Sequence, residues 1–475
     1  MALCLLFGAL SLVKAQNPAL MPNFSKDLYE AEWKLIDSLE NQGLPQSALE
    51  LVTPLHQRAV RDNNPAQVIK TIAYTAKYQA QLSEEDTPIR IVRQLRTEEA
   101  GAPFPVNLVL RSMIAEFYFN YLQSRYWSLR DRTELEEVNE NDPATWPVGK
   151  LISESTRYYL ASLDDPRLSA VNIDLFDAVT TGGEGVDDLR PTLYDFLAHR
   201  AIDHFSNEQT YLNAPAYRFY LDQPEYFAPA AAFAALDISS RDSTSFHLKA
   251  LTLLQDLIQR HLKDADPKAM LDADLKRLDF VYRNSILPEK EEYYRQALEN
   301  VIKGYAGHPM SSEACYQLAQ WFYNQSSSYA PGKESPERWY RKEALKWCEE
   351  GIRRFPGSMG AQSCTELVSA IKKQEFELQT ESVSLPDRPT LAFVGYRNTP
   401  KLWFKVVKAP DEEELQKIDY QQVQAYYAGL PPIAEWIQAF DLPGDFQSHQ
   451  SEITDRKSTR LNSSHLTGSR MPSSA

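Results

Sequence analysis

The chain is 475 residues long, which is room for roughly two to four domains. Its hydrophobic content of 43% and aromatic content of 11% are sufficient for packed cores and exclude a wholly disordered protein. The formal net charge is −15 and no basic run alternates with aromatic residues, so we expect no nucleic-acid partner. The acidic residues are dispersed, as on a solvated surface.

The N-terminus has the pattern of an export signal. Residues 2–13 form an apolar stretch too short to span a bilayer as a helix, and Val13-Lys14-Ala15 supplies small residues where a signal peptidase reads them. We therefore predict a signal peptide over residues 1–15 and a mature protein outside the cytoplasm. A buried N-terminal helix is the alternative interpretation. No later segment is apolar for long enough to be transmembrane.

Helical periodicity dominates residues 27–147, which we interpret as an N-terminal helical region. Its first helix is expected to end at Asn41-Gln42-Gly43, and Ser47 is the expected N-cap of the second. Residues 131–147 form an acidic break that contains proline. The apolar stripes are Leu28, Leu35, Ile36 and Leu39; Ala48, Leu51, Val52 and Leu55; Val68, Ile69, Ile72, Ala73 and Ala76; and Leu110, Met113, Ile114, Phe117, Tyr118, Tyr121 and Leu122.

Residues 148–285 are predicted to form an irregular helical region. One helix is expected over residues 192–205, and Leu251, Leu254 and Ile258 define another. Aromatic residues crowd residues 211–227, which is the pattern of either a recognition surface or an aromatic core in an irregular segment.

This region also holds groups that resemble ligand sites superficially. The two histidines of its first helix are five residues apart and fall on different helix faces, unlike the i, i+4 pair of a zinc helix. A glycine-rich loop lacks the Lys and Ser or Thr of a phosphate loop, and its acidic neighbours lack EF-hand spacing. We therefore predict no catalytic, cofactor-binding or metal site, and no enzyme activity. The residues concerned are Asp195, His199, Asp203 and His204, then Gly182-Gly183-Glu184-Gly185, Asp187 and Asp188.

Residues 286–375 contain a repeated helical motif. Tyr294-x-x-Ala297-Leu298-x-x-Val301 resembles Arg341-x-x-Ala344-Leu345-x-x-Cys348. The helix between them carries Ala314, Leu318, Ala319 and Phe322. Small residues beside leucine and an aromatic residue are typical of paired-helix repeats such as the tetratricopeptide, because they let adjacent helices approach closely. An irregular helical domain is the alternative.

The period of the apolar pattern changes to two after Lys373. Strands are expected around residues 376–380, 391–393 and 402–406, with turns at residues 385–389 and 397–400. Residues 411–427 read as a helical or loop insertion. The predicted fold class is therefore mainly α, with helical hairpins and tetratricopeptide-like repeats in the later part, followed by an incomplete β-sandwich over residues 376–455.

Two further features bear on processing and redox chemistry. Residues 456–475 turn abruptly Ser-rich and basic, and the run Lys457-Ser-Thr-Arg460 to His465 resembles translated sequencing-adapter sequence, so we expect a non-native tail. A genuine disordered tail is the alternative. Cys315, Cys348 and Cys364 have no metal-ligand spacing, and either a single disulfide or buried thiols fits them.

Five strings of residues, taken in order, carry a family resemblance. They are similar to the N-terminal part of the large bacterial alpha-2-macroglobulin-like proteins, in which a helical region precedes an array of sandwich domains. The strings are Trp33-x-x-Ile36-Asp37-Ser38-Leu39-Glu40 with Gly43-Leu44-Pro45-Gln46-Ser47-Ala48-Leu49; Gln67-Val68-Ile69-Lys70; Pro191-Thr192-Leu193-Tyr194-Asp195-Phe196-Leu197-Ala198; Ala344-Leu345-x-x-Cys348 to Phe355-Pro356-x-Ser358-x-Gly360-Ala361; and the strands around Leu402 to Val406.

The resemblance implies a macroglobulin-type sandwich after residue 376 and an exported protease trap in a bacterial periplasm, cell envelope or exterior. Trapping in that family needs a bait region and, in many members, a Cys-x-x-Gln thioester. Here the three cysteines are followed three residues on by Leu318, Gly351 and Leu367, so the motif is absent. The expected function is thus the docking portion of an endopeptidase inhibitor, with proteases or envelope proteins as partners of its parent. The alternative is a stand-alone exported helical-repeat adaptor.

Overall fold

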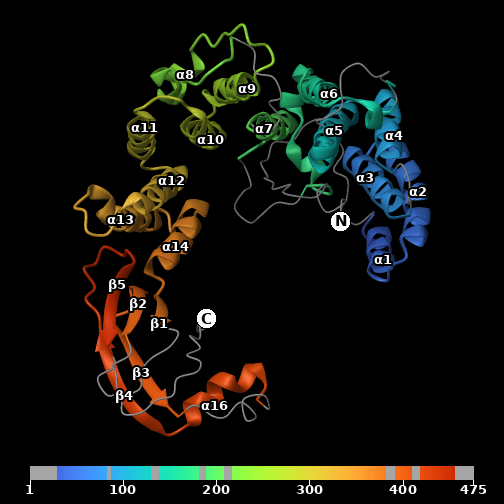
Figure 1. Ribbon diagram of the computed structural model, residues 1–475. Helices are drawn as coiled ribbons and strands as arrows, with labels where there is room; N and C mark the ends of the chain where they lie inside the picture. Colours follow the sequence, from blue (N-terminus) through green and yellow to red (C-terminus); the bar gives the residue numbers. More distant parts are fainter. Residues whose placement is uncertain are drawn as a thin grey trace. The chain divides into compact units, whose positions relative to one another are not determined.

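The computed structural model describes residues 29–82, 87–129, 139–140, 142–180, 189–207, 217–380, 391–408 and 418–454. The fold is mainly helical and ends in a small antiparallel β region, as the sequence predicts (Figure 1). The chain comprises two compact units, Met1–Ala297 and Leu298–Ala475, which are described separately. The predicted signal peptide, the predicted tail and the turn at residues 385–389 lie outside the described residues.

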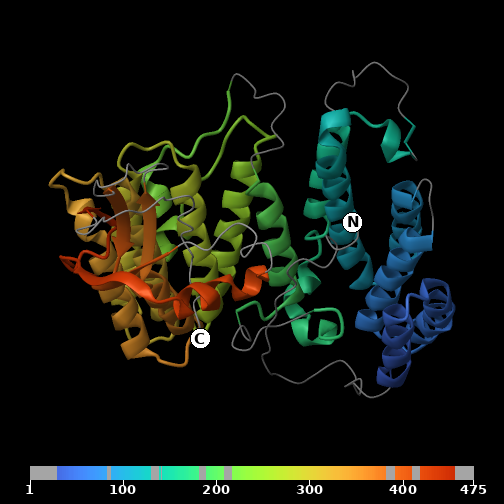
Figure 2. The same ribbon diagram turned by 60° about the horizontal axis from the view of Figure 1, so that its bottom comes forward.

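The first unit consists of helices, with short turns between the first ones and long connections before and after α7. The long helix α5 packs beside α6, and the pair is seen side by side in Figure 2. The predicted helix at residues 192–205 is α7, with Thr192 as its N-cap in a capping box with Asp195. The helices are α1 Glu30–Asn41, α2 Pro45–Arg61, α3 Pro65–Leu82, α4 Thr87–Gly101, α5 Val106–Leu129, α6 Val148–Ala161, α7 Leu193–Phe205, α8 Ala230–Ala234, α9 Phe246–His261, α10 Lys268–Asn284 and α11 Lys290–Gly304, which crosses the unit boundary.

Two details of the N-terminal helices differ from the prediction. Leu35 is 52% exposed, although Ile36 beside it is fully buried, because only one face of α1 packs on α2 and α3. Ser47 is not an N-cap, since α2 begins at Pro45, whose fixed φ suits the first helical position and makes Leu44 the cap. Gly43 ends α1 with φ +73°, as its place after the last helical turn predicts.

Close helix approach defines the helical part of the second unit. Helices α12 Met310–Gln325, α13 Tyr340–Arg354 and α14 Met359–Lys372 pack mutually around Ala319, Ala344 and Cys348. Gly360 is required by this packing, because a Cβ there would lie 2.3 Å from the backbone carbon of Ser312. Gly360, together with the buried Ala319 and Ala344, therefore lets these helices approach closely.

The β region consists of two small antiparallel sheets packed face to face. Strands β1, β2 and β5, in that order, form one sheet, and strands β3 and β4 form a two-stranded ribbon. Val394, Tyr396 and Ile453 from the first sheet share a core with Leu402, Phe404 and Trp436 from the ribbon. Strands β4 and β5 were not predicted individually, and the expected insertion contains α16. The elements are β1 Glu375–Thr380, β2 Leu391–Arg397, β3 Lys401–Val407, α16 Val423–Gly429, β4 Pro432–Ala439 and β5 His449–Thr454.

A tight turn between β4 and β5 joins the β region to the helices of the same unit. Asp445 is 1% exposed and accepts hydrogen bonds from Arg338 Nε at 2.9 Å and from the Gln447 backbone at 3.1 Å. Phe446 has φ +59°, packs on the α12–α14 core, and its carbonyl accepts from Arg341 Nη1 at 2.7 Å. We call residues 444–447 the keying turn.

The keying turn also donates hydrogen bonds to backbone carbonyl groups of the loop between α12 and α13. The Gln447 amide donates to the carbonyl oxygens of Glu337 and Arg338, both at 3.3 Å. Burial opposes charge on Asp445, but hydrogen bonds from His449, Arg338 and the Gln447 backbone outweigh it and lower the carboxyl pKa. The turn is therefore a charged, buried contact, and the β region is held by it as part of the unit.

We predict that Asp445→Ala destabilises the second unit by about 1–3 kcal/mol, because it leaves the buried Gln447 backbone N–H without this acceptor and removes the counter-ion of Arg338. The exposed neighbour Asp441 is the matched control, and Asp441→Ala should change the free energy of unfolding by less than about 0.5 kcal/mol. Urea unfolding of the full chain, followed by limited proteolysis, checks both. Equal effects of the two substitutions would contradict the role of the keying turn.

Candidate functional site

The two histidines of α7 have unrelated surroundings. His204 lies in an aromatic cage, with Tyr159 stacked at 4.5 Å, Phe119 edge-on at 4.5 Å and Phe246 at 5.1 Å between ring centroids. Neither ring nitrogen of His204 has a hydrogen-bond partner among the described residues. Burial alone lowers its pKa to about 3, so the ring is neutral at physiological pH. His204 is therefore a core residue and not a ligand.

The carboxylate of Asp195 at the start of α7 contacts a histidine that the sequence analysis did not single out. His261 Nε2 lies 3.0 Å from Asp195 Oδ1, and its Nδ1 lies 2.6 Å from Asp264 Oδ2. Burial opposes the charge on His261, but the hydrogen bonds and charges of the two carboxylates outweigh it and raise its pKa to about 9. An imidazolium thus bridges α7 to the end of α9.

The other histidine of α7, His199, faces α10. Its Nε2 lies 3.5 Å from Asp272 Oδ2, and its Nδ1 lies 3.3 Å from Lys276 Nζ. Burial lowers the His199 pKa well below 6.5, and the positive charges of Arg190, Lys276 and His261 add to the effect. Lys276 in turn pairs with Asp203 at 2.6 Å.

Together these groups form a polar network that joins α7 to the end of α9 and to α10. Asp195 is engaged by the N-cap of α7 as well as by His261, since its Oδ2 accepts from Thr192 N at 2.9 Å and Oγ1 at 2.8 Å. Within the described ranges, no group of three or more His, Cys, Asp or Glu side chains is placed to hold a metal ion. The network can hold protons and join helices, and it offers no open coordination position among these residues.

The aromatic segment is largely core in the part that the structure describes. Tyr226 and Phe227 are buried, whereas Tyr217 and Tyr220 are 60% and 46% exposed. The fully buried Arg277 of α10 anchors the segment, because its guanidinium donates to the carbonyl oxygens of residues 226 and 228 and pairs with Asp274. Residues 208–216, the glycine-rich loop and Asp187 and Asp188 lie outside the described residues.

The three cysteines are buried thiols in the α12–α14 core. None of Cys315, Cys348 and Cys364 is exposed, and all three are free. Burial raises the pKa of Cys315 to about 12, and the hydrogen bond to Cys348 followed by burial raises that of Cys364 further. Thiols that stay protonated are poor nucleophiles. The structure therefore favours three buried thiols over a disulfide.

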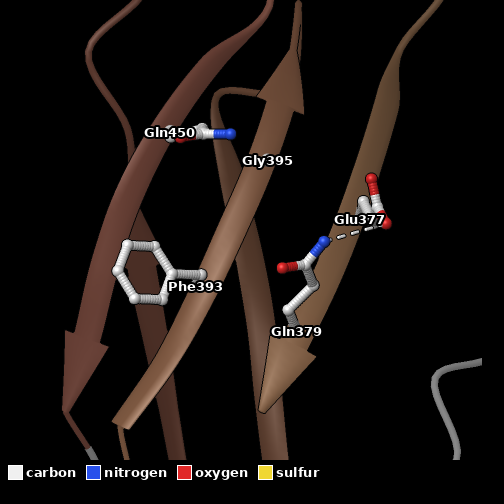
Figure 3. Close-up of a pocket in the computed structure, with 5 residues that line it drawn as sticks. All are labelled: Glu377, Gln379, Phe393, Gly395 and Gln450. Carbon is white, nitrogen blue, oxygen red and sulfur yellow. Dashed lines mark hydrogen bonds between the residues drawn. The ribbon is translucent and has the colours of Figure 1, made fainter.

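A pocket of about 290 Å³ lies on the outer face of the three-stranded sheet (Figure 3). Gly395 forms its floor, with Glu377 and Gln379 of β1 on one side, Gln450 of β5 on the other and the Phe393 ring at one end. Gln379 Nε2 donates weakly to Glu377 Oε1 at 3.3 Å, as the dashed line in Figure 3 marks. We call this pocket the Gly395 hollow. An aromatic ring beside amides and a carboxylate is suited to binding a side chain and not to acid–base chemistry on its own.

Comparison with known proteins adds no assignment to this geometry. No protein-family model matches the chain, and no curated protein matches it significantly. Among the residues that the structure describes, no helix is both long and apolar enough to cross a membrane.

We predict that His204→Phe removes an acid sensitivity of the first unit. Since the folded pKa of about 3 is below the unfolded value near 6.5, the stability that depends on neutral His204 is complete above pH 6.5 and is lost as the pH falls towards 3. Between pH 7.5 and 4.5 the loss is roughly 3 kcal/mol. Urea unfolding of both proteins at the two pH values measures it, and an unchanged pH dependence in the variant would refute the cage assignment.

His261 should have the opposite pH dependence. Its folded pKa of about 9 exceeds the unfolded value, so its contribution to stability is complete below pH 6.5 and is lost as the pH rises through 9. We expect His261→Gln to destabilise the chain at pH 6.5 and to have much less effect at pH 9.5. Unfolding curves at both values check this, and an equal effect of the substitution at both would show that the ring is uncharged.

Proposed function

We propose that the chain is a non-catalytic docking scaffold, the front part of an exported alpha-2-macroglobulin-like endopeptidase inhibitor. The observation that carries this proposal is the keying turn. It fixes a two-layer β region to the last helices through Asp445, Phe446 and Gln447, which is what a helical base that presents a sandwich domain requires. The order of helices before sheets also agrees with the family resemblance of the sequence.

The surface of the β region supports a docking role. It carries Phe376, Phe393, Trp403, Ile433, Ile437 and Leu442 as large apolar side chains that are 41–67% exposed. Isolated exposed apolar residues are ordinary, but a group of them on one small region is typical of protein-binding surfaces. In this proposal helices α12 to α14 position the β region, and the partners are proteases or envelope proteins engaged by the parent protein.

The test begins with the encoding DNA beyond the codon for Asp455. We expect the reading frame to continue through further sandwich domains in place of residues 456–475. A stop codon there would overturn the inhibitor proposal in favour of a stand-alone helical-repeat adaptor.

The protein product of the continued frame then serves for an activity measurement. A trap encloses its protease, so we expect that product to suppress cleavage of a large protein substrate while a short peptide is still cleaved. The present chain, tested beside it at equal concentration, should leave both rates unchanged because it lacks the trapping parts. Inhibition by the present chain alone, or equal suppression of both substrates by the longer product, would contradict the scaffold role.

A further inference from the structure

The helices and the β region of the second unit have separate apolar cores. The β region packs around Val394 and Tyr396, whereas α12, α13 and α14 pack around Ala344 and Cys348. Among the residues that the structure describes, Phe446 of the keying turn is the one side chain of the β region that packs on the core of the helices. Parts that each bury their own core can separate without unfolding, unless a large apolar interface holds them together.

The β region is attached to the helices at a chain junction as well as at the keying turn. Helix α14 ends at Lys372 and β1 begins at Glu375, so residues 373 and 374 connect the two parts. Asn398, in the turn between β2 and β3, braces this junction by donating to the carbonyl oxygens of Ile371 at 2.7 Å and Lys373 at 3.0 Å. We call residues 373 and 374 the pivot, because this covalent connection persists when the keying turn is released.

The keying turn holds Phe446 in a conformation that the residue itself does not favour. Its φ of +59° lies in the left-handed region, which a bulky side chain rarely occupies. Such a conformation persists only where the surroundings impose it, and it is concentrated at functional and switch regions of proteins. Here the helices impose it, because their core holds the ring and Arg341 holds the carbonyl oxygen. Release from the helices relieves this strain, which offsets part of the lost contacts.

The polar contacts of the keying turn can be exchanged for water at little cost. The Gln447 amide donates to the Glu337 and Arg338 carbonyl oxygens at 3.3 Å, which is long for a hydrogen bond. The Arg338 side chain is 32% exposed, so water can replace its carboxylate partner. Asp445 keeps its bonds from the Gln447 backbone and from His449, since both belong to the β region. Its charge therefore remains paired after the turn has left the helices.

We propose that the keying turn is a releasable latch, and that the β region opens as a rigid body about the pivot when the latch releases. The latched arrangement is the major state, and the open arrangement is a minor state in which both cores are intact. Opening frees the carbonyl groups of the loop between α12 and α13. The inference rests on the joint alone and holds whether or not the protein is part of an inhibitor.

The experiment measures the distance between the two parts of the second unit in the full chain. Spin labels are attached at Lys346→Cys on α13, where the side chain is 70% exposed, and at Ile437→Cys on β4, which is 58% exposed. The native cysteines of the α12–α14 core are buried and stay unlabelled, and Cys4→Ser removes the remaining thiol. Pulsed electron double resonance then gives the distribution of distances.

Two substitutions weaken the latch in different ways. Asp445→Asn removes the charge that pairs with Arg338 and leaves an acceptor for the Gln447 backbone, and Phe446→Ala removes the ring from the core of the helices. Asp441→Asn, at an exposed carboxylate in the same connection between β4 and β5, is the matched control. We expect each latch variant to raise the ratio of open to latched molecules at least about fivefold, and the control to leave it unchanged.

Hydrogen exchange of the same variants distinguishes opening from unfolding. In a rigid-body opening, the amides of β2, which pairs with β1 and β5, and those of α13 keep their protection in Asp445→Asn. Distance distributions of both latch variants that match the parent would overturn the proposal. So would a second distance that appears together with loss of protection in β2, because the β region would then unfold when the turn is weakened.

Discussion

One buried carboxylate, that of Asp445, determines how the second unit is built. It accepts from a guanidinium of the helical part, from the backbone of its own turn and from His449 of β5, so helix, turn and strand meet at a single charge. Burying a charge is unfavourable unless each of its oxygens is paired, and here both are. The left-handed conformation of Phe446 directly after Asp445 places its ring in the α12–α14 core, so charge pairing and apolar packing reinforce the same contact.

The two units use polar burial in different ways. In the second unit, the buried charge of Asp445 connects the β region to the helices. In the first unit, the Asp195–His261–Asp264 network connects one helix to another. His204 is a contrasting case, because its ring is held by aromatic neighbours and no hydrogen bond compensates its burial among the described residues. The titration behaviour of these two histidines therefore differs in sign, although both belong to the same packed helical region.

The sequence predicts what depends on local periodicity and fails where distant residues decide. The long stripe of α5 and the capping box of α7 are local signals, and both elements form as expected. Strand β4 escaped prediction because Ile437 on its outer face and Trp436 on its inner face are both apolar, which hides the two-residue period. His261 lies 66 residues from Asp195, so no spacing rule could have joined them.

The keying turn also has a consequence for the order in which the chain becomes structured during synthesis. Arg338 and Asp445 are 107 positions apart in the sequence, and Gln447 is 121 positions from Ser326, whose carbonyl accepts from its amide. The loop between α12 and α13 is therefore translated long before its partners exist, and contacts of such sequence separation form late. Until the ribosome has released residues 444–447, the helices lack the contacts of the keying turn. A chain interrupted before residue 444 would leave that loop open to proteases and chaperones.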